Sequence, residues 1–341
     1  MARIGILTGG GDCPGLNAVI RAVVRRAEGE HEVCGFRNGW AGVLANHALD
    51  LDHRNTAGIL HRGGTILGTS RTNPFREEGG LDRIQETLEA QRIDALIPVG
   101  GEDTLGVAQR CAEAGIDVVG VPKTIDNDLD GTDFTFGFQT AVQICTDAID
   151  RLHTTAESHN RVMVVEVMGR HAGWIAVYSG MAGGADAILV PERPYEIEEV
   201  CARVQRRHDG GRTFSIIVVS EGAKSAGEDQ STTHEGTDAF GHARLGGIAV
   251  SLEHEIGDRT GFESRVTILG HVQRGGTPTA YDRVLATRFG VAAMDAVTAG
   301  RFGNMVALHG PSIELVGLED ALREPKTLDP TLYETAEVFF G

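Results

Sequence analysis

The side chains best suited to chemistry lie in the segment Pro122 to Asp128, which reads Pro-Lys-Thr-Ile-Asp-Asn-Asp. It follows the apolar run Val118 to Val121, so its acids and its lysine stand at the expected end of a strand, where open α/β folds bind ligands. Asp126 and Asp128 suit either a metal or a proton abstraction, because one acid stays ionised as a base while the other orients it or holds a cation's water. Lys123 favours an anionic substrate. A turn rich in Asp and Asn is also ordinary loop chemistry, so this segment alone leaves the function open.

Two glycine-rich segments also follow apolar runs. Gly9 to Gly15 lies between an expected strand and an expected helix, where glycines let backbone N–H groups approach a phosphate closely. The dinucleotide fingerprint fails, because Pro14 stands where its third glycine belongs, so the segment is a phosphate loop or a simple tight turn. Gly100 to Thr104 repeats this pattern with acids added. Glu102 suits the Mg²⁺ that a phosphoryl donor requires, although acids are also favoured in the first turn of any helix.

Arginines stand on further loops of this kind. The segments 168–171 and 270–276, which read Met-Gly-Arg-His and Gly-His-Val-Gln-Arg-Gly-Gly, place guanidinium groups beside glycines, an arrangement suited to bidentate phosphate contact. Arg71 and Arg161 are similar candidates. An isolated Arg is usually a solvated surface residue, but the shared position of these side chains after apolar runs favours phosphate binding.

The chain alternates short apolar runs with longer amphipathic segments, which is typical of a parallel sheet covered by helices. Residues 224–245 are polar and lack periodicity, so we expect a long surface loop there, and the pattern weakens beyond Leu315. We expect helices over 16–26 and 104–114 and strands over 4–7, 95–99, 118–121, 162–167, 187–190, 214–219 and 266–269.

Bulk properties limit the classes of partner and compartment. The formal net charge of -17 argues against binding to nucleic acid or to anionic membranes, so a local cluster of Arg and Lys must hold any anionic ligand. Five cysteines without Cys-x-x-Cys spacing argue against a disulfide framework or a zinc site. No apolar run approaches the ~20 residues of a membrane helix, and the chain opens with a strand-like segment rather than a leader. We therefore expect a cytoplasmic protein of roughly two domains.

Four motifs together resemble the 6-phosphofructokinase family: Gly-Gly-Asp-x-Pro-Gly-x-Asn-Ala at 10–18, Thr-Ile-Asp-Asn-Asp at 124–128, Met-Gly-Arg at 168–170 and Gly-His-x-Gln-Arg-Gly-Gly at 270–276. They occur in the family's order and spacing, and the match runs from Arg3 to about Gly310. The resemblance implies two Rossmann-like α/β/α sandwich domains with the active site in the cleft between them, and a chain that crosses between domains more than once. We expect a phosphoryl-donor domain of 1–137 plus 252–303, a fructose-6-phosphate domain of 138–251 plus 304–322, and a C-terminal tail of 323–341.

The resemblance also implies roles for the matching positions. Asp126 is the expected base that takes the proton from the sugar's 1-hydroxyl, and Asp128 supports it. Glu102 is expected to hold Mg²⁺, although many members have Asp there, and Gly11 and Arg71 are expected to face the donor. The positions implied to hold fructose 6-phosphate are Thr124, Asp126, Met168, Gly169, Arg170, Glu221, His271 and Arg274, and Arg170 counts among the catalytic side chains as well.

Two arginines are expected to act on another subunit. In the family, the residues matching Arg161 and Arg265 reach the 6-phosphate of a neighbouring subunit's substrate. A homodimer or homotetramer is therefore implied. Arg21 and Arg25 match effector-site arginines of allosteric bacterial members, but His153 stands where those members usually have Arg, which speaks against allosteric control.

Two positions bear on the phosphoryl donor. ATP-using members of the common bacterial type have glycine where this chain has Asp103 and Lys123, whereas pyrophosphate-dependent members resemble this chain. Asp103 is expected about where the α-phosphate of ATP lies, and like charges ~4 Å apart repel by roughly 4 kcal/mol at an effective dielectric of 20. That energy corresponds to about three decades of discrimination. Lys123 is expected to neutralise charge on the pyrophosphate leaving group. Lysine also occurs in some ATP-using relatives, so Asp103 carries the decision.

The resemblance thus implies Mg²⁺-dependent, reversible transfer of a phosphoryl group from pyrophosphate to the 1-hydroxyl of fructose 6-phosphate, giving fructose 1,6-bisphosphate and phosphate. The alternatives are an ATP-dependent 6-phosphofructokinase and a sugar-phosphate-binding subunit that has lost catalysis. An NAD or lipid kinase shares a similar glycine-rich acidic loop, but it does not explain the segments 168–170 and 271–274.

Overall fold

The computed structural model describes residues 1–227, 233–237, 243–245 and 247–340. The chain divides into two compact units: the first comprises 1–125, 129–140 and 274–325, and the second comprises 126–128, 141–273 and 326–341. The chain therefore passes between the units more than once, as the sequence predicted. In the part that the structure describes, no helix combines the length and the apolar character needed to cross a membrane.

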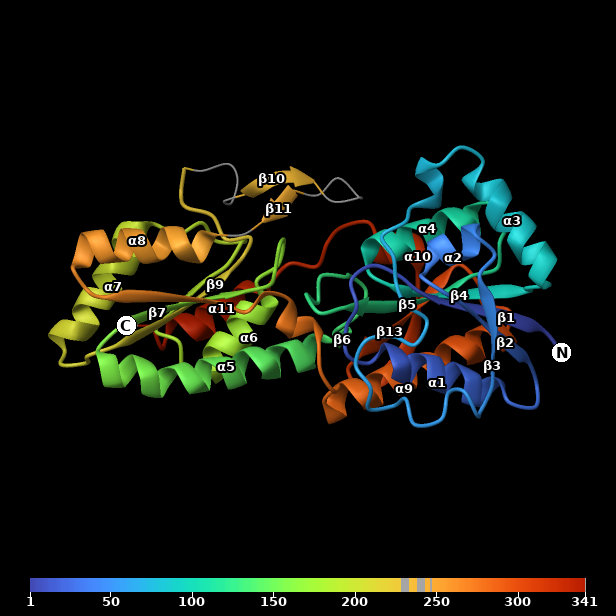
Figure 1. Ribbon diagram of the computed structural model, residues 1–341, viewed down its shortest axis with the longest axis horizontal. Coiled ribbons are helices and arrows are strands. Elements are labelled where there is room, and N and C mark those ends of the chain that lie inside the picture. Colours follow the sequence, from blue (N-terminus) through green and yellow to red (C-terminus); the bar gives the residue numbers. More distant parts are fainter. Residues whose placement is uncertain (228–232, 238–242, 246, 341) are drawn as a thin grey trace. The chain divides into compact units, whose positions relative to one another are not determined.

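The first unit is built on one mixed sheet with the strand order β14-β13-β5-β4-β1-β2-β3, and β6 pairs with β5 (Figure 1). Strands β13, β5, β4, β1 and β2 are paired in parallel, while the edge strands β3 and β14 run antiparallel to their neighbours. The strands are β1 (Arg3–Thr8), β2 (Glu32–Phe36), β3 (Ala48–Leu51), β4 (Ala95–Gly100), β5 (Val119–Thr124), β6 (Phe136–Gly137), β13 (Asn304–His309) and β14 (Ser312–Gly317).

Helices cover both faces of this sheet. Figure 1 shows α1 (Leu16–Ala27) and α9 (Ala280–Thr298) along one face. The two helices approach closely at Gly290, where a Cβ atom would lie 2.7 Å from the Cβ of Ala22. The other face carries α2 (Trp40–Leu44), the 3₁₀ helix η1 (Pro74–Arg76), α3 (Gly80–Gln91), α4 (Glu102–Glu113) and α10 (Leu318–Ala321). Their apolar side chains form a core with those of the sheet, so both faces of the parallel strands are buried.

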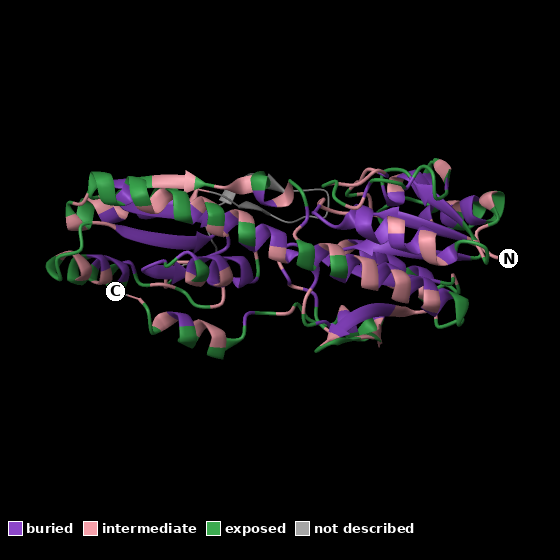
Figure 2. Ribbon diagram, turned by 90° about the horizontal axis from the view of Figure 1, so that it is seen from below, coloured by how far each residue is buried: buried purple, intermediate pink, exposed green. Residues whose placement is uncertain are grey.

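The second unit contains a parallel sheet with the order β12-β7-β9-β8. Its strands are β7 (Val162–Val167), β8 (Ala187–Leu189), β9 (Ser215–Ser220) and β12 (Ser264–Ile268), and its helices are α5 (Phe138–His159), α6 (Trp174–Ala182), α7 (Ile197–Asp209), α8 (Ile248–Thr260) and α11 (Pro330–Glu337), with the 3₁₀ helix η2 (Gly270–Arg274). Figure 2 shows buried strands beside helices whose outer sides are exposed. Apolar side chains of α7 and α8 form one core with the sheet. The valine-rich sequence of β7, Val-Met-Val-Val-Glu-Val, fits this double-sided burial.

The compact units differ from the expected domain boundaries most in two segments, and further in 126–128, which lie in the second unit, and 138–140, which lie in the first. Residues 252–273 were expected with the first domain but lie in the second unit, because β12 pairs in parallel with β7. Residues 304–322 were expected with the second domain but lie in the first unit, because β13 pairs in parallel with β5. Both differences arise from pairings between strands that are far apart in the sequence.

Two segments contain more regular structure than expected. The expected tail, 323–341, includes α11, and the Tyr333 hydroxyl donates a hydrogen bond of 2.8 Å to the Ile188 carbonyl. In the expected surface loop, β10 (Thr233–Thr237) and β11 (Ala243–Leu245) form an antiparallel pair. Residues 228–232, 238–242 and 246 lie outside the described part of the chain, so the loop prediction is corrected only for the two strands.

Candidate active site

The first unit brings its candidate residues to one edge of its sheet. The order β5-β4-β1-β2 means that the chain turns to one side of β1 for β2 and to the other side for β4. Such a reversal of strand order opens a crevice at the carboxyl ends of the two central strands, where α/β folds bind ligands. The loop Gly9 to Asp12 follows β1, and Gly101 follows β4. The Gly9 N–H donates to the Val99 carbonyl at 2.9 Å, so the two loops lie side by side.

Two cations hold the glycine loop after β1. The Lys123 side chain is 3% exposed, and its Nζ donates a hydrogen bond to the Gly11 carbonyl. Arg274 donates through Nη1 to the Asp12 carbonyl at 3.4 Å. A Cβ atom on Gly11 would lie 2.3 Å from that same Nη1, so a side chain there would push the guanidinium aside. A loop of backbone groups between an ammonium and a guanidinium is suited to holding a phosphate.

The acids of the next loop are anchored by a threonine. A Cβ atom on Gly9 would lie 2.5 Å from Thr104 Oγ1, and one on Gly100 would lie 2.3 Å from Thr104 Cβ. Trp40 Nε1 donates to the Thr104 carbonyl at 3.3 Å. These contacts fix the start of α4, so that exposed Glu102 and half-buried Asp103 stand in its first turn beside the loop after β1.

A third segment joins this edge. The Gly10 N–H donates to the Ser70 carbonyl at 3.0 Å, and Thr69 Oγ1 donates to the Gly10 carbonyl at 2.5 Å. Arg71, the next residue, is exposed. The structure therefore brings the expected donor-side residues Gly11, Arg71, Glu102, Asp103 and Lys123 to neighbouring loops of one unit.

The donor-side loops offer few protein ligands for a metal. Among the described residues, no group of three or more His, Cys, Asp or Glu side chains is arranged to hold a metal ion. Mg²⁺ usually keeps several waters and binds one or two carboxylates together with substrate phosphates. An exposed Glu102 carboxylate beside a candidate phosphate loop fits that mode of binding.

The two central acids follow Ile125, where the chain passes from the first unit to the second. Asp126 and Asp128 are both half-buried, and Asn127 between them is buried with a φ of 54°. Asn is one of the few residues that adopt this left-handed conformation readily. The Asp128 carbonyl accepts a hydrogen bond of 2.9 Å from the Lys326 N–H, which ties the segment to the chain before α11.

In the second unit, the loops after β7 and β9 are joined. Ser220 Oγ donates to the Gly169 carbonyl at 2.6 Å, and the Gly222 N–H donates to the same carbonyl at 3.1 Å. Gly169 has a φ of 134°, and a Cβ atom there would lie 2.5 Å from Ser220 Oγ, so only glycine fits. The loop of Met168, Gly169 and Arg170 is thereby placed beside Glu221. Arg170 and Glu221 are half-buried, whereas His271 on η2 is exposed.

Arg161 and Arg265 lie together at the opposite edge of the same sheet. Both donate to Glu263 Oε1, at 2.8 Å from Arg161 Nη2 and 2.5 Å from Arg265 Nη2. The hydrogen bond and charge of Arg161 hold the pKa of the Glu263 carboxyl below its usual range. Arg161 precedes β7 and Arg265 pairs with Met163, near the start of that strand, whereas Met168 follows its end. Six residues of strand span about 20 Å. The structure therefore does not bring these arginines to the Met168 loop of their own chain.

Sequence reasoning missed the side chains that hold the loops. Thr104 and Ser220 were not singled out, and Gln273 was noted only as part of the motif at 270–276, with no role of its own. Each of these side chains is buried and lies against a segment that is far away in the sequence. Thr104 also lies against Gly100 in its own loop. The one available signal was position, because all three lie within or directly beside a glycine-rich candidate loop.

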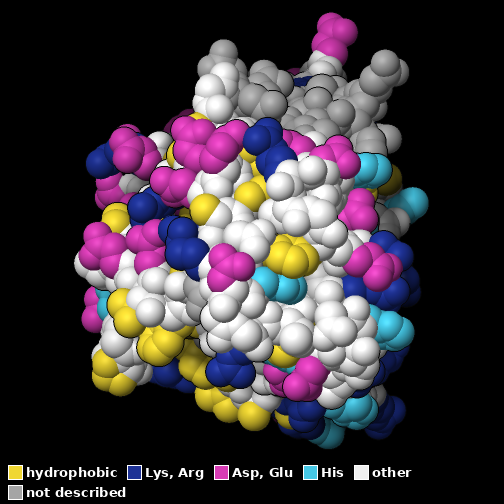
Figure 3. Space-filling model, turned by 90° about the vertical axis from the view of Figure 1, so that its left-hand side faces the viewer, with side chains coloured by type: hydrophobic (Ala, Val, Ile, Leu, Met, Phe, Trp, Pro, Cys, Tyr) yellow, Lys and Arg dark blue, Asp and Glu magenta, His cyan; other side chains and the backbone are white. Residues whose placement is uncertain are grey.

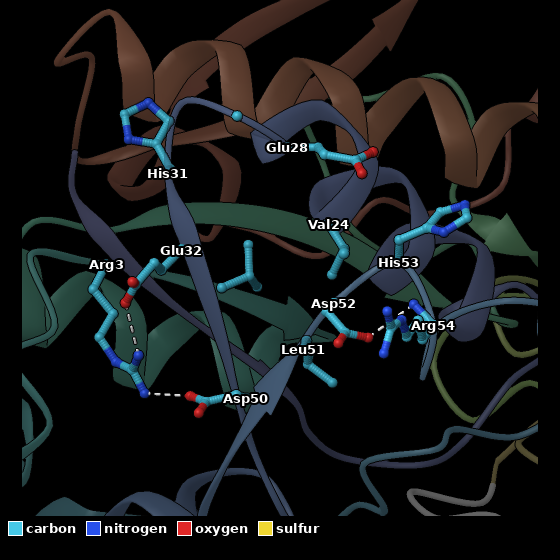
Figure 4. Close-up of a pocket in the computed structure, with 12 residues that line it drawn as sticks. Arg3, Val24, Glu28, His31, Glu32, Asp50, Leu51, Asp52, His53 and Arg54 are labelled. Carbon is cyan, nitrogen blue, oxygen red and sulfur yellow. Dashed lines mark hydrogen bonds and ion pairs between the residues drawn. The ribbon is translucent and has the colours of Figure 1, made fainter.

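A large pocket of about 680 Å³ lies away from these loops. Figure 4 shows Arg3, at the start of β1, pointing between Glu32 at the start of β2 and Asp50 on β3. Its ion pairs measure 3.0 Å to Glu32 and 2.5 Å to Asp50. The pocket is thus at the amino ends of β1 and β2, and the candidate loops follow their carboxyl ends. Pocket size alone does not mark the candidate site.

Surface charge is mixed where it can be viewed directly. On the face shown in Figure 3, Lys and Arg side chains are scattered among Asp and Glu side chains. The ion pairs of the second unit follow the same pattern, for example Arg259 with Glu198 at 2.7 Å and Arg207 with Asp186 at 2.9 Å. On that face, cations are dispersed among acids, in contrast to the cations gathered at the glycine loop.

Comparisons with known proteins agree with this arrangement. The family model described as Phosphofructokinase matches residues 3–297. The chain is 60% identical over 342 residues to the pyrophosphate--fructose 6-phosphate 1-phosphotransferase of Amycolatopsis methanolica, a match that covers 99% of this chain and 100% of the relative. It is 56% identical over 337 residues to ATP-dependent 6-phosphofructokinase 3 of Streptomyces coelicolor, covering 98% of this chain and 99% of the relative.

Solved structures show the same fold. Phosphofructokinase of Pichia pastoris in the T-state superposes with a TM-score of 0.85 at 32% sequence identity. That match covers 94% of this chain but 35% of the Pichia chain, so this chain spans about a third of its length. With a family match over residues 3–297 and relatives that are more than half identical along nearly the whole chain, the protein belongs to the phosphofructokinase family.

Proposed function

We propose that this chain transfers a phosphoryl group from pyrophosphate to the 1-hydroxyl of fructose 6-phosphate, with Mg²⁺, to give fructose 1,6-bisphosphate and phosphate. The observation that carries the proposal is the pair of side chains at the donor-side loops. Asp103 stands at the start of α4, and buried Lys123 reaches the Gly11 carbonyl. The A. methanolica relative, whose name specifies pyrophosphate, supports the same donor.

The donor argument is electrostatic. A phosphate bound at the loop after β1 would meet the Lys123 ammonium, which burial keeps from being screened by water. The carboxylate of Asp103, in the first turn of α4, would repel the additional phosphate of a nucleotide. Pyrophosphate is short enough to be held by the cation without extending past the acid. Both side chains therefore favour the smaller donor.

The acceptor is proposed to bind at the loops of the second unit. Arg170 and His271 would contact the phosphate of fructose 6-phosphate, and Met168, Gly169 and Glu221 would complete its binding in this unit. Thr124 and Arg274, which lie in the first unit, are also proposed to contact it. Asp126 would take the proton of the attacking 1-hydroxyl, with Asp128 in support. Removal of that proton as the oxygen attacks phosphorus is general-base catalysis.

Glu102 is proposed to hold Mg²⁺ together with the donor phosphates and water. Bound there, the ion would supply positive charge to the phosphoryl oxygens. The side chains of this chain do the remaining work: Lys123 binds the donor, Arg170 binds the acceptor and Asp126 moves the proton.

The two units are proposed to divide the substrates, with the donor at the first and the sugar phosphate at the second. We also propose a homodimer or homotetramer in which Arg161 and Arg265 complete the neighbouring subunit's site. Their position at the far edge of the sheet from Met168 supports this proposal. A cytoplasmic location is proposed because all five cysteines are buried free thiols, which suits a reducing compartment.

A mixing experiment tests the shared site. Arg161→Ala and Asp126→Asn chains should each be nearly inactive alone, because each lacks one half of a complete site. Co-expressed with separate purification tags, the hybrid should regain part of the wild-type activity. Hybrids that stay as inactive as their parents would contradict the shared site.

The second candidate is an ATP-dependent 6-phosphofructokinase, favoured by the S. coelicolor relative of that name. Steady-state assays of the purified chain with each donor, at saturating fructose 6-phosphate and Mg²⁺, separate the two. Production of fructose 1,6-bisphosphate with pyrophosphate is the expected result. Turnover with ATP alone would favour the second candidate, and absence of turnover with both donors would favour a sugar-phosphate-binding subunit.

A further inference from the structure

Gln273 is a polar side chain at the edge of the second sheet that is completely buried, with 0% of its surface exposed. Its Oε1 accepts a hydrogen bond of 3.1 Å from the Met168 N–H and one of 3.1 Å from the Cys145 thiol. Its Nε2 donates to the Gly270 carbonyl at 3.0 Å. The amide therefore contacts α5, the loop after β7 and the start of η2.

The orientation of the amide follows from its partners. An N–H must meet an oxygen and a carbonyl must meet an N–H, so Met168 and Gly270 fix opposite ends of the group. Burial raises the pKa of the Cys145 thiol, which therefore keeps its proton and donates. No other uncharged side chain carries both an acceptor and a donor at this length.

The amide continues the pairing of β12 with β7 beyond the end of the strands. The ladder reaches Leu269, whose N–H donates to the Glu166 carbonyl at 3.0 Å. There the chain turns into η2, and the side chain of Gln273 reaches back to the backbone of Met168. The loop 168–170 and the turn 270–273 are thus joined by one side chain rather than by a backbone ladder.

The geometry points to Gln273 as a positioning residue that sets the Met168–Arg170 loop and the His271 turn at the spacing needed for the sugar phosphate. The inference rests on the proposed function, since it assumes that these two loops bind fructose 6-phosphate. Gln273 would act through Met168 and His271 without contacting the substrate. Lys123 and Thr104, which hold the donor side in the first unit, are not among the partners of Gln273, whereas Arg274, the next residue along the chain, donates to the Asp12 carbonyl of the glycine loop.

Binding of fructose 6-phosphate to the full chain by calorimetry, without donor, tests the inference. Gln273→Met keeps the size of the side chain but removes its hydrogen bonds, and it should weaken binding about tenfold or more, since small misplacements of binding groups have effects of that size. Gln273→Glu keeps an acceptor for Met168 but turns an oxygen toward the Gly270 carbonyl, and it should also weaken binding. The KM for pyrophosphate should change less than the affinity for fructose 6-phosphate in both variants.

Val204→Ala is the matched control, because it opens a cavity in the core of the same unit away from both loops. It should lower the melting temperature and leave fructose 6-phosphate binding unchanged. In the wild-type chain, the Met168 amide should exchange slowly with deuterium. Failure of the wild type to bind fructose 6-phosphate would remove the proposed function itself. If the wild type binds fructose 6-phosphate, two results would overturn the role of Gln273. One is a folded Gln273 variant that binds fructose 6-phosphate equally tightly, and the other is rapid exchange of the Met168 amide in the wild type.

Discussion

The loops at the strand ends of the two units are held by different kinds of groups. In the first unit, the cations of Lys123 and Arg274 donate to carbonyl groups of the glycine loop. In the second unit, the hydroxyl of Ser220 and the amide of Gln273 hold the loop after β7. Charged side chains therefore help to hold the strand-end loops, here called the framework, in the first unit, and neutral side chains hold them in the second.

This difference has a consequence for binding. An anion that enters the first unit's loops competes with backbone carbonyls for the cations that hold them, so binding and loop conformation change together. In the second unit, the framework can stay fixed while Arg170 meets the ligand. Substitutions should therefore affect stability and binding jointly in the first unit, and separately in the second.

The largest loss of activity should come from substitution of the proposed base, because no loop-holding side chain of either unit can take over its proton transfer. Asp126→Asn should lower kcat about 10²- to 10⁴-fold, the usual contribution of a general base, with fructose 6-phosphate binding retained. Asp130→Asn, an exposed acid in the same segment, is the control and should keep wild-type kcat. Initial rates and calorimetry provide the measurements. Near-normal turnover by Asp126→Asn would refute the assigned base.

The next effect concerns a framework cation. Lys123→Met should lower kcat/KM for pyrophosphate about 10²- to 10³-fold, a loss comparable to that of a preorganised donor to developing charge. It should also destabilise the chain by about 1 kcal/mol, because the Gly11 carbonyl loses its donor in a partly buried place. Lys224→Met, a half-buried lysine of the second unit, serves as control. A stable Lys123→Met protein with weakened pyrophosphate binding would break the comparison, since the two effects would then be separable.

A smaller effect is expected from a neutral tie in the second unit. Ser220→Ala removes the hydroxyl that donates to the Gly169 carbonyl, while the Gly222 N–H still donates there. A single hydrogen bond contributes about 1 kcal/mol, so the KM for fructose 6-phosphate should rise about fivefold. The KM for pyrophosphate should not move, and Ser179→Ala, a buried serine within α6, should change neither constant. An equal rise in both KM values would show that the units are not independent in this respect.

The smallest effect is a pH dependence of stability. In the first unit, His309 Nε2 donates to the Gly131 carbonyl at 2.8 Å and Nδ1 lies 3.2 Å from Glu314, and these contacts raise the pKa of His309. A raised folded-state pKa stabilises the folded chain. This stabilisation is fully present below the unfolded-state pKa of about 6.5 and is lost as pH rises through the folded-state pKa. The unfolding free energy should therefore be a few tenths of a kcal/mol higher at pH 6 than at pH 8, since the pair is partly exposed.

His309→Gln should remove this slope in denaturant titrations at the two pH values. Glu263 in the second unit should show the opposite pH dependence, because its pKa is lowered in the folded chain. Its contribution to the unfolding free energy is present above its unfolded-state pKa and is lost as pH falls through its folded-state pKa. An unchanged slope between pH 6 and 8 in His309→Gln would contradict the assignment to His309.

The sequence predicted those parts of the fold that depend on local pattern. The bounds predicted for β7 match the structure, because a run of that length with valine at four of six positions is characteristic of a strand buried on both faces. By contrast, β2 was missed, since its Gly35 breaks the pattern. That glycine makes room for the side chain of Leu67, which a Cβ atom would approach to 2.6 Å. The domain boundaries differed because they depend on the pairing of β12 with β7 and of β13 with β5, which no local pattern records.

The same distinction applies to the candidate site. Glycine loops with Arg, Lys or acids could be recognised from residue types alone, and the structure places them at strand ends. The side chains that hold these loops could not be recognised in this way, because Gln273 and Met168 are 105 residues apart and Lys123 and Gly11 are 112 residues apart. Only the folded chain makes those contacts visible.

In the proposed mechanism, one carboxylate in the first unit selects the donor, and Asp103→Gly removes that carboxylate. The ratio of kcat/KM for pyrophosphate to kcat/KM for ATP should be measured in the wild type and in this variant at saturating fructose 6-phosphate and Mg²⁺. The wild type should strongly prefer pyrophosphate, and in the variant the ratio should fall toward ATP by up to about three decades. A wild type that uses ATP as well as pyrophosphate, or a ratio unchanged by the substitution, would contradict this mechanism.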